Sequence, residues 1–346
     1  MPNLEQAPLL VNGDLARFGR SRVYSPVQDC KHDPGNNQGV EMEPIRSLEE
    51  LKQRARELPS KTVAVVRADE VETLTAVMTA VDQDMLEAVL VGDSGEIAKA
   101  AIEAGVKIKG IEIVEASGDA DASAKGVELI RQGRAQILMK GLVSSSTYLK
   151  AILDKESGIR GGGLLSHVAA FTVPTYPKLL IVTDAAMNIA PDFDQKVEIL
   201  RNAIVVAKAL GIEMPKATYV CAKEVPYDKM PCTLEAARMK KMVENGEITG
   251  VEFDGPLALD LAVSFESKKI KKVESSVAGQ VDIILTPDIE AGNILYKTLL
   301  FLSNAEGAAV IMGATHPAVL TSRADSAESK LCSLVLASLI ASHLHG

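Results

Sequence analysis

The amino-acid sequence predicts two α/β domains with a cleft between them. The chain has 346 residues, about two domains' worth at roughly 150 residues each. Short, almost continuous apolar runs alternate with stretches in which apolar residues recur at helical spacing. Such runs are typical of strands buried on both faces, and their alternation with helices indicates right-handed crossovers in a doubly wound sheet.

The first half of the chain is expected to contain four strands and the helices between them. Ser47 and Glu50 have the spacing of a capping box, which predicts a helix that begins there. The expected strands cover 62–66, 89–91, 111–114 and 136–139. The expected helices cover 71–81, 94–102, 122–132 and a segment that includes 148–153.

Glycines at 161–163 interrupt this pattern and predict a second domain that begins near residue 156. Segments 164–173 and 178–183 are separated by one short proline-containing turn, which favours an antiparallel hairpin and therefore a mixed sheet. Further strands are expected at 217–222, 281–286, 308–313 and 318–321. Further helices are expected at 194–210, 233–244, 289–303 and 325–342.

The composition argues against nucleic-acid binding. Lys and Arg number 37 against 46 Asp and Glu, which gives a net charge of −9. Only six Tyr, six Phe and no Trp are available for stacking on bases. Nucleic-acid binding requires a basic face and, for single strands, aromatic platforms, so we expect no nucleic-acid partner.

The cysteines and apolar segments indicate a soluble cytoplasmic protein. The four cysteines have no CxxC spacing and form no zinc pattern with the histidines, so we expect no metal or disulfide role. No apolar run approaches the ~18 residues of a membrane helix, and the N-terminus lacks a signal-peptide core, so we expect no membrane partner. Residues 1–41 hold no sustained apolar period and are expected to form a flexible extension.

The turn after the strand at 136–139 is a candidate anion site. Lys140 is followed by a helix start that contains Ser144 and Ser145. Backbone N–H groups and the helix dipole favour an anion at such a position, and the lysine adds positive charge. The alternative is an ordinary helix cap, because Ser and Thr are preferred there in any case.

Two further strand ends carry polar side chains. Asp184 and Asn188 follow the strand at 178–183, where Asp184 alternatively caps a turn. Asp288 follows the strand at 281–286 and is explained as a helix cap. Gly292 and Asn293 in the following helix are poor helix formers, so an additional requirement is expected to select them.

The segment around Ser322 and Arg323 is the most informative. A strand delivers both residues to the start of a helix that opens at Asp325 or Ser326, and the planar guanidinium of arginine binds phosphate in a bidentate manner. The alternative is a surface ion pair of Arg323 with Asp325 or Glu328.

The basic run 268–272 is interpreted as a solvated loop, with contact to the phosphates of a nucleotide-like ligand as its alternative.

Five segments together resemble the phosphate acyltransferase family, which contains phosphate acetyltransferases and phosphate butyryltransferases. The resemblance covers about 45–346, and the TSRADSAES form of the last segment is closer to the butyryl branch. The five segments, in order along the chain, are 166–169, 183–191, 255–260, 287–297 and 321–328.

The resemblance implies reversible transfer of a short acyl group, butyryl, between coenzyme A and inorganic phosphate, without a cofactor, a metal or a covalent acyl-enzyme. It also implies a fold like that of the isocitrate and isopropylmalate dehydrogenases, in which the last helix returns to the first domain. The expected domains are therefore 42–155 plus 315–346, and 156–314. Small-molecule substrates and a homo-oligomer are the expected partners. Apolar helices such as 293–302 suit an oligomer interface, with packing in the core as the equal alternative.

The resemblance assigns roles to residues at matching positions. Arg323 holds the acyl phosphate, and Ser322 bonds to it or to the developing oxyanion. The catalytic Asp of the acetyl branch is replaced here by Ser329, so Asp325 or Glu328 is the candidate base. An arginine of the acetyl branch is also missing, for which Lys150 or Arg160 is the candidate substitute. The expected substrate-binding set is Lys140, Ser144, Ser145, Lys150, Arg160, His167, Asp184, Asn188, Asp288 and Asn293.

Three other functions remain open from the sequence. Phosphate acetyltransferase activity is the nearest alternative, because one methylene contributes only ~1 kcal/mol to binding in a pocket. A metal-dependent decarboxylating dehydrogenase of similar fold needs a cluster of Asp ligands that the sequence does not supply. A non-catalytic coenzyme A sensor would use the same binding residues without turnover.

Overall fold

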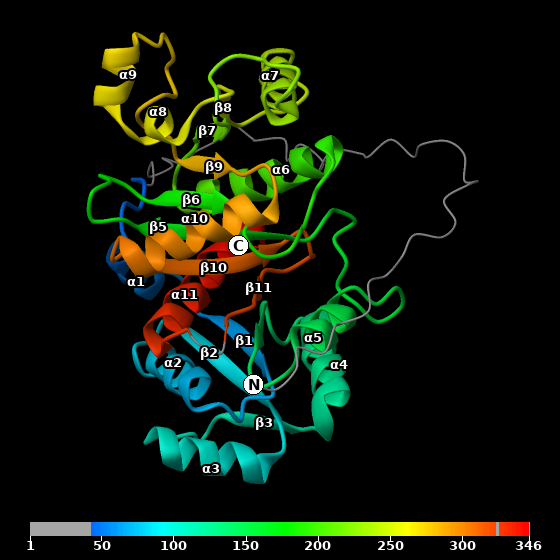
Figure 1. Cartoon of the computed structure of the whole chain (residues 1–346). Coiled ribbons are helices and arrows are strands. Elements are labelled where there is room, and N and C mark those ends of the chain that lie inside the picture. The colour runs from blue at the N-terminus through cyan, green and yellow to red at the C-terminus, as the bar shows by residue number, and fades with distance from the viewer. Residues whose placement is uncertain (1–42, 323–324, 346) are drawn as a thin grey trace, which may run out of the picture. The chain divides into compact units, whose positions relative to one another are not determined.

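One mixed β-sheet runs through the protein in the computed structural model, which describes residues 43–322 and 325–345 (Figure 1). The eleven strands of this described part lie in the order β3-β2-β1-β4-β11-β10-β5-β6-β9-β7-β8. The strands are β1 (Lys61–Val66), β2 (Leu86–Gly92), β3 (Glu112–Glu115), β4 (Ile137–Lys140), β5 (Ser166–Thr172), β6 (Leu180–Thr183), β7 (Lys216–Tyr219), β8 (Glu252–Phe253), β9 (Ile283–Leu285), β10 (Glu306–Met312) and β11 (Ala318–Val319).

The described helices flank this sheet. They are α1 (Leu48–Glu57), α2 (Val71–Asp82), α3 (Ser94–Ala104), α4 (Gly118–Arg131), α5 (Ser145–Ile152), α6 (Phe193–Ala209), α7 (Pro231–Glu244), α8 (Leu259–Val263), α9 (Phe265–Lys271), α10 (Ile289–Leu302) and α11 (Ala327–His345). Ser47 caps α1 by accepting a hydrogen bond from the Glu50 amide, as its spacing predicted.

The middle of the sheet is antiparallel and its two sides are parallel. β5 pairs antiparallel with β6 and with β10, and β10 pairs antiparallel with β11. β1, β2, β3, β4 and β11 pair parallel on one side, and β6, β7, β8 and β9 do so on the other. The predicted hairpin and the mixed sheet are therefore confirmed.

The two faces of the sheet are packed differently. On one face, Val63 and Val65 of β1 belong to the same buried cluster as Val168 and Ala170 of β5. On the other face, the alternate residues of β1 and β5 fall into two separate clusters, one around Ala64 and Val66 and one around Ala169 and Phe171. One core is therefore continuous along the sheet, whereas the opposite face has two cores side by side.

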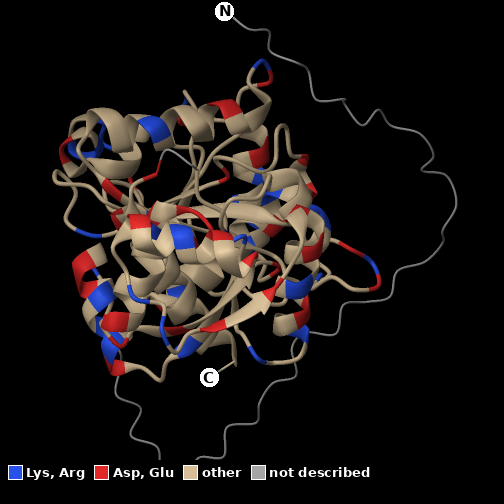
Figure 2. Ribbon diagram, turned by 90° about the horizontal axis from the view of Figure 1, so that it is seen from below, with Lys and Arg blue, Asp and Glu red and all other residues tan. Residues whose placement is uncertain are grey.

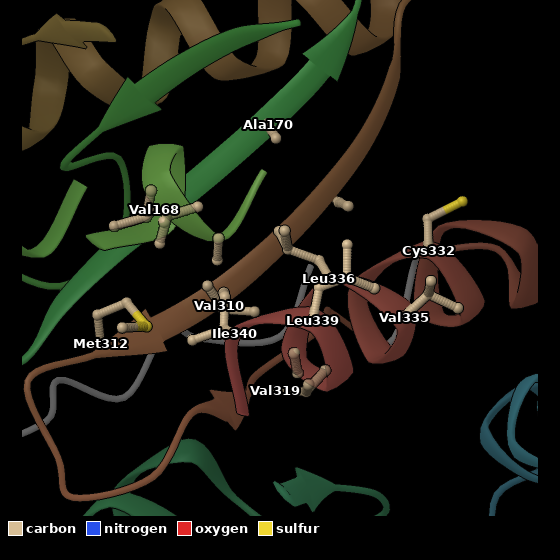
Figure 3. Close-up of a cluster of buried hydrophobic side chains, with 14 of the residues drawn as sticks. Val168, Ala170, Val310, Met312, Val319, Cys332, Val335, Leu336, Leu339 and Ile340 are labelled. Carbon is tan, nitrogen blue, oxygen red and sulfur yellow. The ribbon is translucent and has the colours of Figure 1, made fainter. Parts of the chain in front are cut away.

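Helix α11 forms the centre of the continuous core. It packs on β10 and on α1, α2 and α6, and Figure 3 shows Leu336, Leu339 and Ile340 against Val310 of β10 and Val168 of β5. Among the described residues, α11 is the one helix that is long and apolar enough to span a membrane, with 67% of its most apolar window buried in the fold. The expectation that no segment reaches that length and composition was wrong, and core packing explains the composition.

Several short elements were not predicted. Strand β8 and helices α8 and α9 fall in a segment where no sustained apolar period is visible. The basic run 268–272 is the last turn of α9 and its cap rather than a loop, with Lys272 at a φ of 52°. Lysines at a helix C-terminus interact favourably with the helix dipole. The predicted extension 1–41 lies outside the described residues, and the division at 155–156 and 314–315 stays a prediction.

Candidate functional site

A pocket of about 460 Å³ lies where several strands end. Residues at or after the carboxyl ends of β4, β6, β9 and β11 line it, together with His167 at the start of β5. This is where open α/β sheets bind their ligands. The lining residues are Lys140, Val143, Ser144, Ser145, His167, Ala185, Ala186, Asn293, Tyr296, Lys297, Leu320, Thr321, Ser322 and Asp325.

The pocket lies between the two separate cores. Val143 and Leu320 pack with the cluster around Val66, and Tyr296 packs with the cluster around Phe171. Side chains of both hydrophobic cores therefore contribute to the lining of the pocket.

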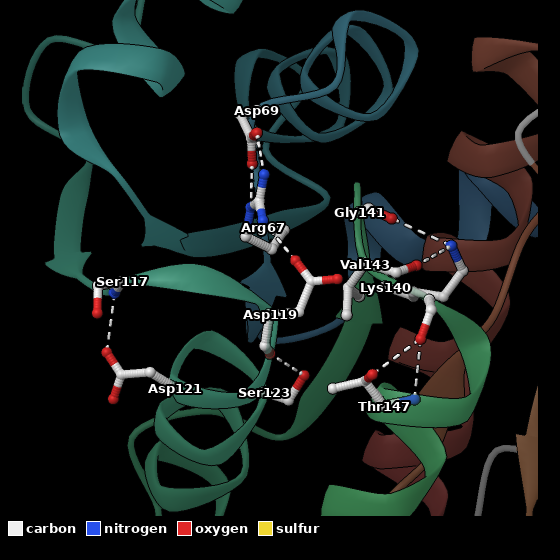
Figure 4. Close-up of polar contacts among 11 residues, drawn as sticks. Arg67, Asp69, Ser117, Asp119, Asp121, Ser123, Lys140, Gly141, Val143 and Thr147 are labelled. Atoms are coloured by element: carbon white, nitrogen blue, oxygen red, sulfur yellow. Dashed lines mark hydrogen bonds and ion pairs between the residues drawn. The ribbon is translucent and has the colours of Figure 1, made fainter.

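The turn from β4 to α5 places a buried cation beside a helix N-terminus. The Lys140 ammonium donates to the carbonyls of Gly141 and Val143 at 3.1 Å each (Figure 4). Ser144 caps α5 by accepting from the Thr147 amide at 3.1 Å. A Cβ on Gly141 would lie 2.1 Å from the Arg67 carbonyl, so only glycine fits this turn. The capping alternative is confirmed for Ser144, which also lines the pocket, and the anion site stays a prediction.

Arg67 stabilises the neighbouring end of β1. Its guanidinium binds both carboxylate oxygens of Asp69, at 2.9 and 2.8 Å, and also pairs with Asp119 (Figure 4). Its carbonyl accepts the Leu142 amide at 2.8 Å. The residue that follows β1 therefore holds the β4–α5 turn through a backbone hydrogen bond.

Asp184 and Asn188 shape the loop after β6. One carboxylate oxygen of Asp184 accepts the amides of Ala186 and Met187 at 2.9 Å, and the other accepts from the Asn188 side chain at 2.6 Å. Asn188 also donates to the Leu165 carbonyl at 2.8 Å. The turn-capping alternative is confirmed for Asp184, and it is Ala185 and Ala186 of this loop that line the pocket.

Helix α10 is fitted closely against this loop. Asp288 caps the helix by accepting the Ala291 amide at 2.8 Å. A Cβ on Gly292 would lie 2.1 Å from the Asp184 carbonyl, and the Asn293 amide donates to the Ala185 carbonyl at 3.1 Å. These contacts are the additional requirement that the two poor helix formers indicated.

The segment before α11 presents a hydroxyl and a carboxylate. The Ser322 amide donates to the Asp325 carboxylate at 2.7 Å, and the Asp325 amide donates to the Ser322 carbonyl at 3.1 Å. Ser326 caps α11 through the Ser329 amide at 3.2 Å. Arg323, the expected phosphate ligand, lies outside the described residues.

Buried Lys330 of α11 binds the segment that precedes this helix. Lys330 is 1% exposed, and its ammonium donates to the Asp325 carbonyl at 3.3 Å and lies 3.5 Å from the Glu70 carboxylate. The segment that carries Ser322 and Asp325 is thereby attached to the start of α2.

Several of the sequence-predicted residues do not line the pocket. Glu328 pairs with Lys52 of α1 at 2.8 Å, so of the two candidate bases only Asp325 faces the cavity. Lys150 is exposed in the last turn of α5, and Arg160 forms a β-bridge with Ala314. The pocket lining includes neither Asn188, Asp184 nor Asp288, which act on loops and caps.

His167 lies at the amino end of β5 and is 4% exposed. Its ring lines the pocket and meets the Tyr296 ring edge-on, with centroids 5.5 Å apart. Burial lowers its pKa, Asp184 and Asp325 act in the opposite sense, and Lys297 lowers it further. Burial therefore favours the neutral imidazole.

Seven lining residues were not singled out from the sequence: Val143, Ala185, Ala186, Tyr296, Lys297, Leu320 and Thr321. Tyr296 and Lys297 stand in the resembling segment 287–297, beside the polar residues that drew attention to it. Their helical spacing from Asn293 was the available signal, since residues three and four apart share a helix face.

The three cysteines within the described part of the chain show no sign of a reactive pair with histidine. Cys221 and Cys332 are buried, Cys232 is half-buried, and burial raises the pKa of Cys332 to about 12. Within the ranges 43–322 and 325–345, no group of three or more His, Cys, Asp or Glu side chains is arranged to hold a metal ion. Cys30 lies outside those ranges.

Comparison with known proteins identifies the family. Residues 118–338 match the family model described as phosphate acetyl/butaryl transferase, and this segment contains every lining residue of the pocket. The phosphate butyryltransferase of Clostridium acetobutylicum is 42% identical over 297 residues, which cover 86% of this chain and 99% of that protein. The chain belongs to this family.

Other members of the phosphate acetyl/butaryl transferase family are similar over comparable lengths. The phosphate acetyltransferase of Thermotoga maritima is 40% identical over 85% of this chain and 99% of that protein. A crystal structure of a branched-chain phosphotransacylase from Enterococcus faecalis matches with a TM-score of 0.73 and 33% identity, over 81% of this chain and 99% of that one. Family membership and the α/β fold predicted from sequence are thus confirmed.

Proposed function

We propose that the protein transfers a short acyl group reversibly between coenzyme A and inorganic phosphate, with butyryl as the preferred group. The reaction is butanoyl-CoA plus phosphate giving coenzyme A plus butanoyl phosphate. The observation that carries the proposal is the pocket itself, in which two ammonium groups, a helix N-terminus and several hydroxyls converge within a segment matching the acyltransferase family.

The polar side of the pocket suits phosphate. Lys140 and Lys297 supply positive charge, and Ser144 and Ser145 stand at the N-terminus of α5, where backbone N–H groups favour anions. Ser322 adds a hydroxyl beside them. Both substrates carry phosphate, so these groups neutralise the anion that is bound or that leaves. Arg323 completes this set in the proposal, as the ligand of the acyl phosphate.

The apolar side suits a short acyl chain. Val143, Leu320 and Tyr296 line the same cavity. Each methylene buried against such side chains contributes about 0.8 kcal/mol, or roughly a fourfold preference. Acetyl transfer is therefore the second candidate function, which the similarity to the Thermotoga maritima phosphate acetyltransferase favours.

The remaining expectations are part of the same proposal. The two ends of the sheet are proposed to belong to two domains of the isocitrate and isopropylmalate dehydrogenase type, with the pocket in the cleft between them. The protein is proposed to work in the cytoplasm and to have no resident cofactor. Ile294, Phe301 and Leu302 of α10 are 68%, 71% and 80% exposed, which supports a homo-oligomer assembled through this helix. Acidic and basic residues are interspersed along the ribbon in Figure 2, in keeping with small-molecule partners rather than nucleic acid.

The test is release of free thiol from acyl-CoA with and without inorganic phosphate. Phosphate-dependent release is expected, fastest with butyryl-CoA in a series that includes acetyl-, propionyl- and branched acyl-CoA. Lys297→Met is expected to lower kcat/KM at least tenfold, whereas Lys99→Met on exposed α3 serves as the matched control. A rate of thiol release that does not depend on phosphate contradicts the proposal. A tenfold preference for acetyl-CoA over butyryl-CoA means that acetyl transfer, rather than butyryl transfer, is the function.

A further inference from the structure

We infer that His167 is the catalytic base that accepts the proton of the coenzyme A thiol. The inference rests on the proposed function and deepens it. His167 Nδ1 is buried and has no hydrogen-bond partner among the described residues, although the ring lines the pocket. Buried polar nitrogens are almost always paired, so an unpaired one in a binding site indicates a group that waits for its partner.

The carboxylates near the pocket are already occupied. Asp325 accepts the Ser322 amide at 2.7 Å. Asp184 accepts three donors within its own loop. Glu328 is paired with Lys52 outside the cavity. A base must be free to receive a proton, and each of these carboxylates already has a structural partner.

The charges around His167 suit this role. Asp184 after β6 and Asp325 before α11 favour the imidazolium, while Lys297 of α10 and burial favour the neutral ring. The other charged group that lines the cavity is Lys140 at the end of β4. Burial dominates, so the free enzyme holds a neutral imidazole that can accept a proton. A phosphate dianion bound in the same cavity then stabilises the imidazolium as it forms.

In each direction of the reaction, His167 takes one proton from the attacking group and gives it to the leaving group. In the direction from acyl phosphate, the thiol S–H bond breaks and its proton passes to His167. The thiolate attacks the carbonyl carbon, the new C–S bond forms, and the C–O bond to phosphate breaks. The leaving phosphate oxygen takes the proton back from His167, which restores the neutral ring. In the opposite direction, phosphate loses its proton to His167 and the leaving thiolate receives it.

Tyr296 fixes the ring for this transfer. Its edge-on contact with His167 and its second edge-on contact with Phe171, at 5.3 Å, attach the imidazole to the neighbouring core. Tyr296 is thus a positioning residue, because it acts through the His167 ring.

The test compares pH profiles for acyl transfer from butanoyl phosphate to coenzyme A, measured for His167→Gln, the unmutated protein and Asp325→Asn. At pH 7, His167→Gln is expected to lower kcat at least 100-fold, and the loss should shrink as pH rises toward the thiol pKa near ~8.5. There the thiolate forms without a base. The unmutated protein should lose kcat/KM only on the acid side of pH 6.5, and Asp325→Asn should keep that profile shape.

Each outcome separates this inference from the proposed function. An unmutated protein without phosphate-dependent thiol release overturns both. An active protein whose His167→Gln variant is impaired by one constant factor from pH 6 to 9 overturns the base alone, because a structural role lowers the rate equally at every pH. Where His167→Gln does not fold, judged by thermal unfolding, the profile of the unmutated protein decides: no loss on the acid side of pH 6.5 contradicts the base.

Discussion

Replacing Gly292 by alanine separates helix propensity from tertiary packing. Gly292 lies in the first turns of α10, where alanine by itself would stabilise the helix by up to about 1 kcal/mol. The added Cβ, however, would lie 2.1 Å from the Asp184 carbonyl oxygen and 2.8 Å from the Thr286 hydroxyl. Real Cβ atoms essentially never come within 3.0 Å of such a neighbour, so α10 or the Asp184 loop must move by roughly 0.9 Å.

The packing penalty is expected to exceed the gain in propensity. Forcing an extra carbon into a closed contact costs about 1–3 kcal/mol in packed proteins, and here the nearest neighbour is backbone, which yields less easily than a side chain. We expect Gly292→Ala to lower the free energy of unfolding by about 2 kcal/mol. Asn293, Tyr296 and Lys297 move with the helix, and a misplacement of about 1 Å can lower a rate up to ~100-fold, so a loss of at least tenfold in kcat/KM should accompany it.

The assay is urea unfolding followed by circular dichroism, together with thiol release from butyryl-CoA. Gly95→Ala is the matched control, because Gly95 lies in exposed α3 and its added Cβ would meet only the Asp93 side chain, at 3.2 Å. That substitution is expected to be neutral or stabilising, with unchanged activity. A Gly292→Ala protein as stable as the Gly95→Ala protein refutes the argument that the Asp184 carbonyl determines the choice of glycine.

Three other outcomes are expected. Lys330→Met leaves the Glu70 carboxylate without its buried partner and should lower the free energy of unfolding by about 3 kcal/mol in urea unfolding. Burial lowers the pKa of His316 to about 4, below its unfolded value of 6.5, so the free energy of unfolding should fall by about 1 kcal/mol as pH drops from 6.5 to 4. Glu328→Gln should keep kcat within about twofold, because its partner is Lys52 rather than the substrate.

Each of these expectations has a control. Lys99→Met on the surface should change the free energy of unfolding by less than about 0.5 kcal/mol, and an equally small effect of Lys330→Met contradicts the buried pair. His316→Phe should abolish that part of the pH dependence, and an unchanged slope places its origin elsewhere. Asp325→Asn should reduce kcat at least tenfold, because Asp325 holds the Ser322 amide at the pocket; a larger effect from Glu328→Gln contradicts the placement of Glu328 outside it.

The sequence by itself determined most of the elements and the strand ends at which the pocket lies. Strand and helix periods, the caps at Ser47 and Asp288, and the short turn before Lys178 depend on neighbouring residues only. For the same reason Lys140, Ser144 and Ser322 could be placed at the pocket, because each follows or closes a strand. The family could also be recognised from the order of its motifs.

Only the tertiary structure decided which side chains face the cavity. Asp325 and Glu328 stand three residues apart, yet one lines the pocket and the other reaches Lys52 of α1. Local spacing fixes the direction of a side chain relative to its own helix, and not what packs against that helix. His167 differs from a satisfied core histidine only because no donor or acceptor from any other described element reaches its Nδ1, a property that depends on all of its neighbours in space.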